Sequence, residues 1–176
     1  MIIKPQVINT KRLELKNLRE NDLNRMHILF NDKLIKATYM IKDFSCGEEE
    51  QKFFHKLIEV SSKEDRFVYG IYLKDELIGF LNDCCIIGDE IELGYFIDPM
   101  HWNKGYASEA LTAAIDTLFN LGYQKVIAGY FEENGASLHV MLKSKMLKVD
   151  KEEIIEYKSV KHRCLYTEIK NPKTKF

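Results

Sequence analysis

The stretch E-L-G-Y-F-I-D-P-M-H-W-N-K-G-Y-A-S-E-A, which runs from Glu92 to Ala110, decides how this chain folds. It passes from a strand through a turn into the start of a helix. Pro99 has no backbone N–H to donate, so strand pairing ends there. Gly105 lets another group approach the backbone closely, and Ala107 is small enough to do the same. The stretch therefore predicts a strand joined by an open turn to a helix.

The beginning of this helix has the chemistry of an anion site. The first turn of a helix leaves N–H groups without internal partners, and the helix dipole adds positive potential there. A pyrophosphate suits such a site, and Lys104 adds a mobile positive charge. The spacing is neither G-x-x-x-x-G-K-[ST] nor G-x-G-x-x-G, so it supports neither a P-loop NTPase nor a Rossmann dinucleotide site. A glycine at a helix entry that binds no ligand is the alternative interpretation.

The hydrophobic pattern of the rest of the chain predicts an α/β (α+β) fold with a mixed sheet. Strands are expected over 7–16, 66–73, 76–87, 89–98 and 125–131, with two more between 146 and 169. Helices are expected over 48–61, 105–121 and 133–143, and from Asn21 or Asp22 onward with Leu23, Met26, His27 and Phe30 on one face. The strand–helix–strand order over 90–131 implies a right-handed parallel crossover. We expect one domain, 1–176, with about six to seven strands flanked by about four helices.

The composition is that of an ordinary globular protein. Of its 176 residues, 45% are hydrophobic and 30% are charged, which argues against intrinsic disorder. The formal net charge of −1 lacks the broad positive field of a nucleic-acid binder. No apolar run approaches the roughly 18 residues that span a bilayer, and the first residues lack the apolar core of a secretory signal. We therefore expect a cytoplasmic protein that binds neither nucleic acid nor membrane.

The cysteines predict no metal or redox site. They are Cys46, Cys84, Cys85 and Cys164, and no two of them have the C-x-x-C spacing. Cys84 and Cys85 are adjacent in an apolar stretch, so we expect them to point to opposite faces of a strand. Buried small hydrophobic residues are the expected role of these thiols.

Several stretches resemble the GCN5-related N-acetyltransferase (GNAT) family, and within it the ribosomal-protein alanine N-acetyltransferases. The most specific is W-N-K-G-Y-A-S-E-A-L at 102–111, supported by T-K-R-L-E-L at 10–15, E-L-G-Y at 92–95 and N-G-A-S at 134–137. The resemblance covers about 10–145 and implies a GNAT-like domain. It implies direct transfer of an acetyl group from acetyl-CoA to a primary amine, without a metal. The acceptor is expected to be a protein N-terminal α-amine or a small amine.

The resemblance also implies which residues bind acetyl-CoA. In the family, the strand before the loop is splayed from the strand after it, and the pantetheine lies between them. The pyrophosphate loop would consist of Trp102, Asn103, Lys104, Gly105, Tyr106 and Ala107. Tryptophan stands where the family loop usually begins with Gln or Arg. The backbone of Phe96, Ile97 and Asp98 would bind the pantetheine, and Asn134 would touch the cofactor near the thioester.

Glu92 is the candidate general base. A lysine amine is about 2.5 pKa units harder to deprotonate than an α-amine, or roughly 3.4 kcal/mol, so a base matters most for a lysine-like acceptor. The resemblance puts a carboxylate at Glu92 on the cofactor-facing strand, and an apolar strand would raise its pKa toward neutrality. The alternative is a surface glutamate that alternates with Glu90 on a half-exposed face.

Ser137 is the candidate general acid and a contact to the cofactor. Many family members carry a tyrosine seven residues after the helix-opening asparagine, but Met141 stands there and cannot donate a proton. In the ribosomal-protein subgroup a serine three residues after the asparagine is the usual candidate, and Ser137 matches it. An ordinary helix-start residue is the alternative. Lys145 stands where the family often has the glycine that ends this helix, so we expect an altered C-cap.

Two alternatives of other classes stay open. Met141 and Lys145 allow a catalytically weak acyl-CoA-binding or regulatory module. Nucleic-acid binding through the lysine-rich stretch 143–163 is disfavoured, because acidic residues are interspersed with the lysines. The expected partners are therefore acetyl-CoA and an amine acceptor. An exposed strand edge near 155–168 would also support a homodimer.

Overall fold

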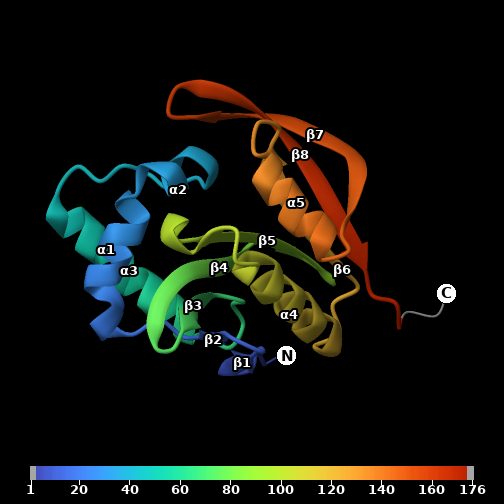
Figure 1. Cartoon of the computed structure of the whole chain (residues 1–176), viewed down its shortest axis with the longest axis horizontal. Coiled ribbons are helices and arrows are strands. Elements are labelled where there is room, and N and C mark those ends of the chain that lie inside the picture. Colours follow the sequence, from blue (N-terminus) through green and yellow to red (C-terminus); the bar gives the residue numbers. More distant parts are fainter. Residues whose placement is uncertain (1–2, 174–176) are drawn as a thin grey trace.

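The computed structural model describes residues 3–173, and these residues form one mixed sheet with helices on both faces (Figure 1). The strands are β1 (Val7–Asn9), β2 (Glu14–Lys16), β3 (Tyr69–Leu73), β4 (Glu76–Ile87), β5 (Glu90–Ile97), β6 (Lys125–Phe131), β7 (Leu147–Tyr157) and β8 (Val160–Lys170). The α-helices are α1 (Leu23–Asn31), α2 (Lys33–Thr38), α3 (Gly47–Ser62), α4 (Tyr106–Asn120) and α5 (Gly135–Lys143). Two 3₁₀ helices, Glu20–Asp22 and Pro99–His101, lie between them.

The strand order is β1-β2-β3-β4-β5-β6-β8-β7 over the residues that the structure describes. Every neighbouring pair is antiparallel except β5 and β6, which are parallel and joined through α4. The mixed α/β sheet and the parallel crossover predicted for 90–131 are thereby confirmed. The eight observed strands exceed the expected six to seven because the first predicted strand is divided in two.

Two apolar layers cover the two faces of the sheet. Successive side chains of a strand point to opposite faces, so β5 contributes to both layers. Ile91 and Leu93 pack in the core under α4, whereas Phe96 packs in the core under α1 and α3. Helix α4 is held by a buried stripe at helical spacing, made of Ala110, Leu111, Ala114, Ile115 and Leu118. This packing fixes the start of α4 beside the end of β5.

The predicted strand over 7–16 is wrong, because the chain reverses at Thr10. The backbone N–H of Thr10 donates to the Leu13 carbonyl at 2.9 Å, and its hydroxyl oxygen accepts from the Leu13 N–H at 2.8 Å. The two halves, β1 and β2, pair antiparallel with each other. The turn is closed by a threonine side chain and hardly changes the alternation of apolar and polar residues over 7–16. This alternation therefore does not predict the turn.

The helical region after residue 20 also differs from the prediction. Asp32 caps an unpredicted helix, α2, by accepting from the N–H groups of Leu34 and Ile35 at 2.8 and 3.0 Å. With six residues, α2 is too short to show helical periodicity. His27, expected on the apolar face of α1, is exposed and hydrogen-bonds Glu50 at 2.8 Å.

The expectation that Cys84 and Cys85 are buried on opposite faces is wrong. The pairing register of β4 with β5 shifts between Asp83 and Cys85, which leaves Cys84 as an extra residue. This bulge breaks the strict alternation of side chains, and both cysteines are exposed. Among the described residues, Cys164 is the buried cysteine.

The end of α5 keeps the usual C-cap geometry despite the missing glycine. Lys145 adopts a left-handed backbone with φ of 65°, which is the conformation that a glycine would supply. The N–H of Met146 donates to the Met141 carbonyl at 3.1 Å, and the N–H of Lys145 donates to the Leu142 carbonyl at 3.0 Å. The expected change in the C-cap is therefore not seen.

At the end of the sheet formed by the C-terminal hairpin, the edge strand is β7 and not β8. Strand β8, which holds most of the predicted edge at 155–168, is paired on both sides, with β6 and with β7. Strand β7 carries many charged side chains and an irregular register between Val149 and Glu152. Charges and a bulge are features that oppose edge-to-edge pairing. Among the described helices, none combines the length and apolar character needed to cross a membrane.

Gly79 is predicted to be essential for the close approach of β4 and β5. A Cβ atom at Gly79 would lie 2.4 Å from the Phe96 carbonyl oxygen and 2.8 Å from Ile97 Cδ1. We expect Gly79→Ala to lower the free energy of unfolding by about 1–3 kcal/mol, because the backbone of β5 must shift. Urea denaturation measures this change. The matched control is Gly47→Ala in α3, where a Cβ meets no atom within 4 Å and stability should hold or rise slightly. Equal stability of Gly79→Ala and the wild type would contradict the close approach.

Candidate active site

Strands β5 and β6 diverge within the sheet. Their parallel ladder has three residue pairs and ends at Glu92 opposite Ile127. Beyond this point β5 continues to Ile97 and β6 to Phe131, without further pairing between them. The splay expected from the family resemblance is therefore present.

A cavity of about 510 Å³ fills the gap between the diverging strands. Its lining includes residues 93–97 of β5 together with Gly129 and Tyr130 of β6. On the α4 side it is lined by the start of α4 and by α5, and on the other side by Ile35, Thr38 and Tyr39. Because these residues come from both apolar layers, the cavity passes through the plane of the sheet. Two reactants can thus meet in it from opposite faces.

The open end of α4 borders this cavity. Gly105, with φ of 80°, precedes the first helical residue and has no side chain with which to cap the helix. Asn103 is also left-handed, with φ of 58°, so the loop turns twice before the helix begins. Gly105, Tyr106, Ala107 and Ser108 line the cavity. Uncapped N–H groups beside a cavity fit a diphosphate.

The loop is fixed to the end of β5 by Trp102. Its indole Nε1 donates to the Ile97 carbonyl at 2.6 Å, while the ring is 42% exposed and lines the cavity. Trp102 therefore holds the loop at the mouth of the gap between the strands.

The predicted cofactor residues divide into two groups. The cavity is lined by Phe96, Ile97, Trp102, Asn103, Gly105, Tyr106, Ala107, Asn134 and Ser137. Asp98 and Lys104 are not among the lining residues. The Asp98 N–H donates to the Ile78 carbonyl at 2.7 Å, and its buried carboxylate pairs with Arg25. The Lys104 ammonium donates to the Met100 carbonyl at 3.0 Å.

Ser137 is held in a small polar cluster at the start of α5. Asn134 caps this helix by accepting from the Ser137 N–H at 3.1 Å. The Ser137 hydroxyl lies 3.1 Å from the hydroxyl of Tyr95, which also donates to the Ser137 carbonyl at 3.2 Å. Burial raises the pKa of Tyr95, so its hydroxyl stays protonated. Tyr95 was not predicted as a site residue. The sequence signal that could have indicated Tyr95 is its alternation with Leu93 and Ile97, which places it on the α4 face of β5.

Glu92 lies at the last rung of the β5–β6 ladder, opposite Cys85 on one side and Ile127 on the other. It is half-buried and does not belong to the cavity lining. Burial raises the pKa of Glu92, the positive charge of Lys151 opposes this rise, and Glu153 adds to it. A carboxylate with a raised pKa is a stronger proton acceptor than an ordinary surface glutamate.

Met141 occupies a core position. It is 1% exposed, and the Thr167 hydroxyl donates to its sulfur at 3.2 Å. The position at which many family members carry a tyrosine is thus used here for packing.

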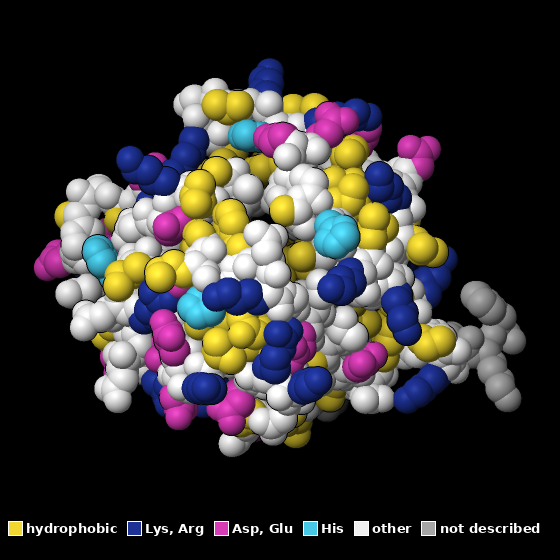
Figure 2. Space-filling view, in the orientation of Figure 1, with side chains coloured by type: hydrophobic (Ala, Val, Ile, Leu, Met, Phe, Trp, Pro, Cys, Tyr) yellow, Lys and Arg dark blue, Asp and Glu magenta, His cyan; other side chains and the backbone are white. Residues whose placement is uncertain are grey.

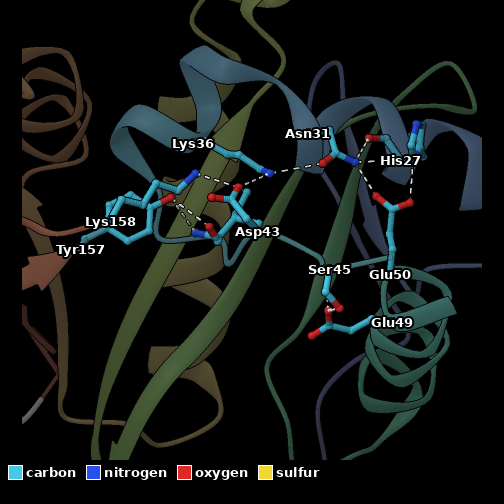
Figure 3. A network of polar contacts seen from close by, with 10 residues as sticks. His27, Asn31, Lys36, Asp43, Ser45, Glu49, Glu50, Tyr157 and Lys158 are labelled. Atoms are coloured by element: carbon cyan, nitrogen blue, oxygen red, sulfur yellow. Dashed lines mark hydrogen bonds and ion pairs between the residues drawn. The ribbon is translucent and has the colours of Figure 1, made fainter. Parts of the chain in front are cut away.

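A cluster of polar contacts joins the α2–α3 segment to the β7–β8 turn on the side of the cavity away from α4. Asp43 accepts from the ammonium groups of Lys36 and Lys158 at 2.8 and 2.9 Å, and lies between them in Figure 3. The Tyr157 hydroxyl donates to the Ile41 carbonyl at 2.9 Å. These contacts hold residues 36–43 next to the end of the hairpin, beside the cavity-lining Tyr39.

Comparison with known proteins establishes the family. The model of the acetyltransferase (GNAT) domain matches residues 12–147, which include the diverging strands, the loop and α5. The chain belongs to the GNAT family of acetyltransferases, and acetyl-CoA is its co-substrate. Among the described residues, no group of three or more His, Cys, Asp or Glu side chains is placed to hold a metal ion.

Relatives extend over most of the chain. An N-acetyltransferase of Bacillus subtilis, YoaA, is 25% identical over 142 residues, which cover 78% of this chain and 80% of the relative. The structure of a ribosomal-protein alanine acetyltransferase from Vibrio fischeri has a TM-score of 0.80 at 17% identity, covering 97% of this chain and 99% of that one. The spermidine N-acetyltransferase of Vibrio cholerae, in complex with CoA and spermine, has a TM-score of 0.76 at 20% identity, with 92% and 97% covered. At these identities the two structures support the fold.

The loop assignment predicts a loss of acetyl-CoA binding in Gly105→Asp. A carboxylate at the open end of α4 would repel the diphosphate, and we expect the Kd for acetyl-CoA to rise at least about tenfold. Isothermal titration calorimetry measures this change. Gly88→Asp is the matched control, because Gly88 is also left-handed, with φ of 61°, and a Cβ there meets no atom within 4 Å. An unchanged affinity in Gly105→Asp would refute the assignment of 102–107 to the phosphates.

Proposed function

We propose that this acetyltransferase moves the acetyl group of acetyl-CoA directly onto a primary amine, either a protein N-terminal α-amine or a small amine. The observation that carries the proposal is the cavity between β5 and β6, which connects the open end of α4 with the opposite face of the sheet. Acetyl-CoA would enter from the α4 side and the amine from the side of Tyr39. The neighbours of similar fold include one enzyme named for a ribosomal-protein alanine and one named for spermidine.

Within the cavity, we assign the diphosphate to the loop 102–107. The uncapped helix end supplies N–H donors, and the left-handed Gly105 lets the phosphates approach the backbone. The pantetheine would lie along the unpaired part of β5 at Phe96 and Ile97. Asn134 would then be near the thioester, where it also holds Ser137 in place. Asp98 and Lys104 would act from the edge of this site.

Glu92 is proposed as the base that accepts the proton of the attacking amine. Its side chain leaves β5 on the same face as Gly94 and Phe96, away from α4. Gly94 has no side chain, and a Cβ there would lie 3.2 Å from the ring of Tyr39. We place the amine beside the cavity-lining Tyr39, on the face of β5 to which Glu92 points. The raised pKa of Glu92 matches the requirements of a base that works near neutrality.

Ser137 is proposed as the group that protonates the leaving sulfur. When the amine nitrogen bonds to the carbonyl carbon, the carbon–sulfur bond breaks and the CoA thiolate takes up a proton. The Ser137 hydroxyl is in the cavity on the α5 side and is hydrogen-bonded to Tyr95. A thiol has a pKa of about 8.5, so the thiolate is a tolerable leaving group. Proton donation therefore assists the reaction without being essential.

The alternative is an acyl-CoA-binding module with weak catalysis, which the buried Met141 favours. Calorimetry with acetyl-CoA and with CoA, followed by a panel of amines, separates the two. The panel contains peptides with N-terminal Ala or Ser, spermidine and free lysine. We expect one-to-one binding and release of CoA with at least one class of amine. Binding without turnover over the whole panel would favour the module, and no binding at millimolar concentration would refute both.

Glu92→Gln is expected to lower kcat by about 10²-fold or more while leaving the Kd for acetyl-CoA unchanged. Below its raised pKa the wild-type base is protonated, so the wild-type kcat/KM should fall with decreasing pH at a pH above the usual glutamate range. The variant should lack this acid limb. Glu90→Gln, two residues earlier in β5, is the matched control and should keep full activity, because Glu90 pairs with Lys125 at 2.6 Å. If Glu92→Gln retains the wild-type rate and pH profile, another group is the base.

A further inference from the structure

The turn between β1 and β2 is fastened to α4 by a cluster around Arg12. The Glu109 carboxylate accepts from the Arg12 backbone N–H at 2.8 Å and from its Nε at 2.7 Å. It also accepts from the Thr10 hydroxyl at 2.6 Å. Glu109 lies in the first turn of α4, and these donors hold its pKa below the usual range. The guanidinium is thus held in one orientation by a charged partner.

From this position Arg12 contacts the loop at Lys104 and Tyr106 and lies near Gly105 between them. Its Nη1 donates to the Lys104 carbonyl at 2.9 Å. The guanidinium carbon lies 4.4 Å from the centroid of the Tyr106 ring. A Cβ on Gly105 would be 3.4 Å from Arg12 Nη2. The Arg12 guanidinium therefore packs against the loop before α4.

The contact with the Lys104 carbonyl has a consequence for the peptide that follows it. This peptide is planar and trans, so its C=O and N–H point in opposite directions. Holding the Lys104 carbonyl toward Arg12 turns the Gly105 N–H away from Arg12. Gly105 has no side chain in the way and lines the cavity. One hydrogen bond on the outside of the loop thus sets the direction of a donor on the inside.

We propose that Arg12 is a positioning residue for the diphosphate of acetyl-CoA, which orients the Gly105 N–H through the Lys104 carbonyl and is itself oriented by Glu109. The inference rests on the proposed role of the loop 102–107. Arg12, Lys104 and Lys143 also line a shallow groove outside the loop, together with Glu109 and Asp116. Figure 2 shows Lys and Arg side chains over the middle of one face of the molecule, with acidic side chains among them. The groove thus has acidic as well as basic side chains, so the orientation of individual donors matters for binding a diphosphate there.

The test compares acetyl-CoA with S-acetylpantetheine, which has the same thioester and lacks the diphosphate. In Arg12→Ala we expect kcat/KM for acetyl-CoA to fall about tenfold or more, mainly through KM, and kcat/KM for S-acetylpantetheine to stay within about twofold. Inhibition by adenosine 3′-phosphate 5′-diphosphate, which has the diphosphate without the pantetheine arm, should weaken by a similar factor. Arg12→Lys should not restore the affinity, since one ammonium cannot bind Glu109 and the Lys104 carbonyl with the geometry of the guanidinium fork.

Arg66→Ala is the matched control. Arg66 is 42% exposed, against 38% for Arg12, and its guanidinium pairs with Asp83 through two contacts of 2.7 and 3.2 Å. Loss of this ion pair should either lower kcat/KM for acetyl-CoA and for S-acetylpantetheine by the same factor or leave both values unchanged. Circular dichroism verifies that each variant is folded, and Glu109→Gln provides a milder variant that should shift the same ratio in the same direction.

Two outcomes would overturn the inference, namely an equal loss with both substrates or no loss with either in Arg12→Ala. Gly105→Asp then separates the inference from the proposed function. If Gly105→Asp weakens acetyl-CoA binding and Arg12→Ala does not, the loop binds the diphosphate without help from Arg12. If neither variant weakens binding, the role of the loop itself is wrong.

Discussion

The structure depends on the point at which β5 and β6 stop pairing. Two adjacent parallel strands normally share hydrogen bonds along their length, but here the ladder ends after Glu92 and Ile127. Both strands remain held on their outer sides, β5 by β4 and β6 by β8, so each can leave the other without leaving the sheet. Beyond Glu92, the β5 backbone groups that face away from β4 have no strand partner, and among them the Ile97 carbonyl accepts from Trp102. The gap can therefore stay open, because each strand is stabilised by pairing with its other neighbour.

The crossover helix determines which ligand suits this gap. Helix α4 begins where β5 ends, and the buried stripe along α4 fixes this relation. Its N-cap is a glycine, so the N–H groups of the first turn are left to water or to an anion. Trp102 holds the loop from the side of β5, and Arg12 holds it from the side of the N-terminal turn. The loop is thus held at one end through the Ile97 carbonyl of β5 and in its middle through its own Lys104 carbonyl, and neither contact uses a backbone N–H group of the loop.

Much of this arrangement could be predicted from the sequence, because the long elements have strong periodicity. Strands β4 and β6 and helix α4 were found within a residue or so of their bounds, and the G-Y-A-S-E-A stretch indicated the loop. Most of the misses arise where the backbone departs from regular geometry over one or a few residues. Thr10 closes a turn within an alternating pattern, Asp32 caps a helix too short to show a period, and a bulge at Cys84 shifts the register. The backbone of Lys145 adopts a left-handed conformation that is rare for residues other than glycine. The partnership of Tyr95 with Ser137 joins residues 42 positions apart, which no local pattern reveals.

In the proposed reaction, the sheet itself separates the proton acceptor from the proton donor. Glu92 leaves β5 on the face of Phe96, whereas Tyr95 and Ser137 meet on the face of α5. The amine nitrogen adds to the carbonyl carbon, which becomes tetrahedral, and the sulfur then leaves it. Nitrogen and sulfur are separate substituents of that carbon, so two different groups can serve the two proton transfers. A carboxylate beside the hydroxyl cluster would accept a hydrogen bond from Ser137 and compete with the departing thiolate for its proton. Because Glu92 and Tyr95 are an odd number of positions apart in β5, they point to opposite faces, and the carboxylate is kept away from the Tyr95–Ser137 pair. The alternation of side chains along β5 therefore places the proposed base on one face of the sheet, and on the other face the tyrosine that contacts the proposed acid.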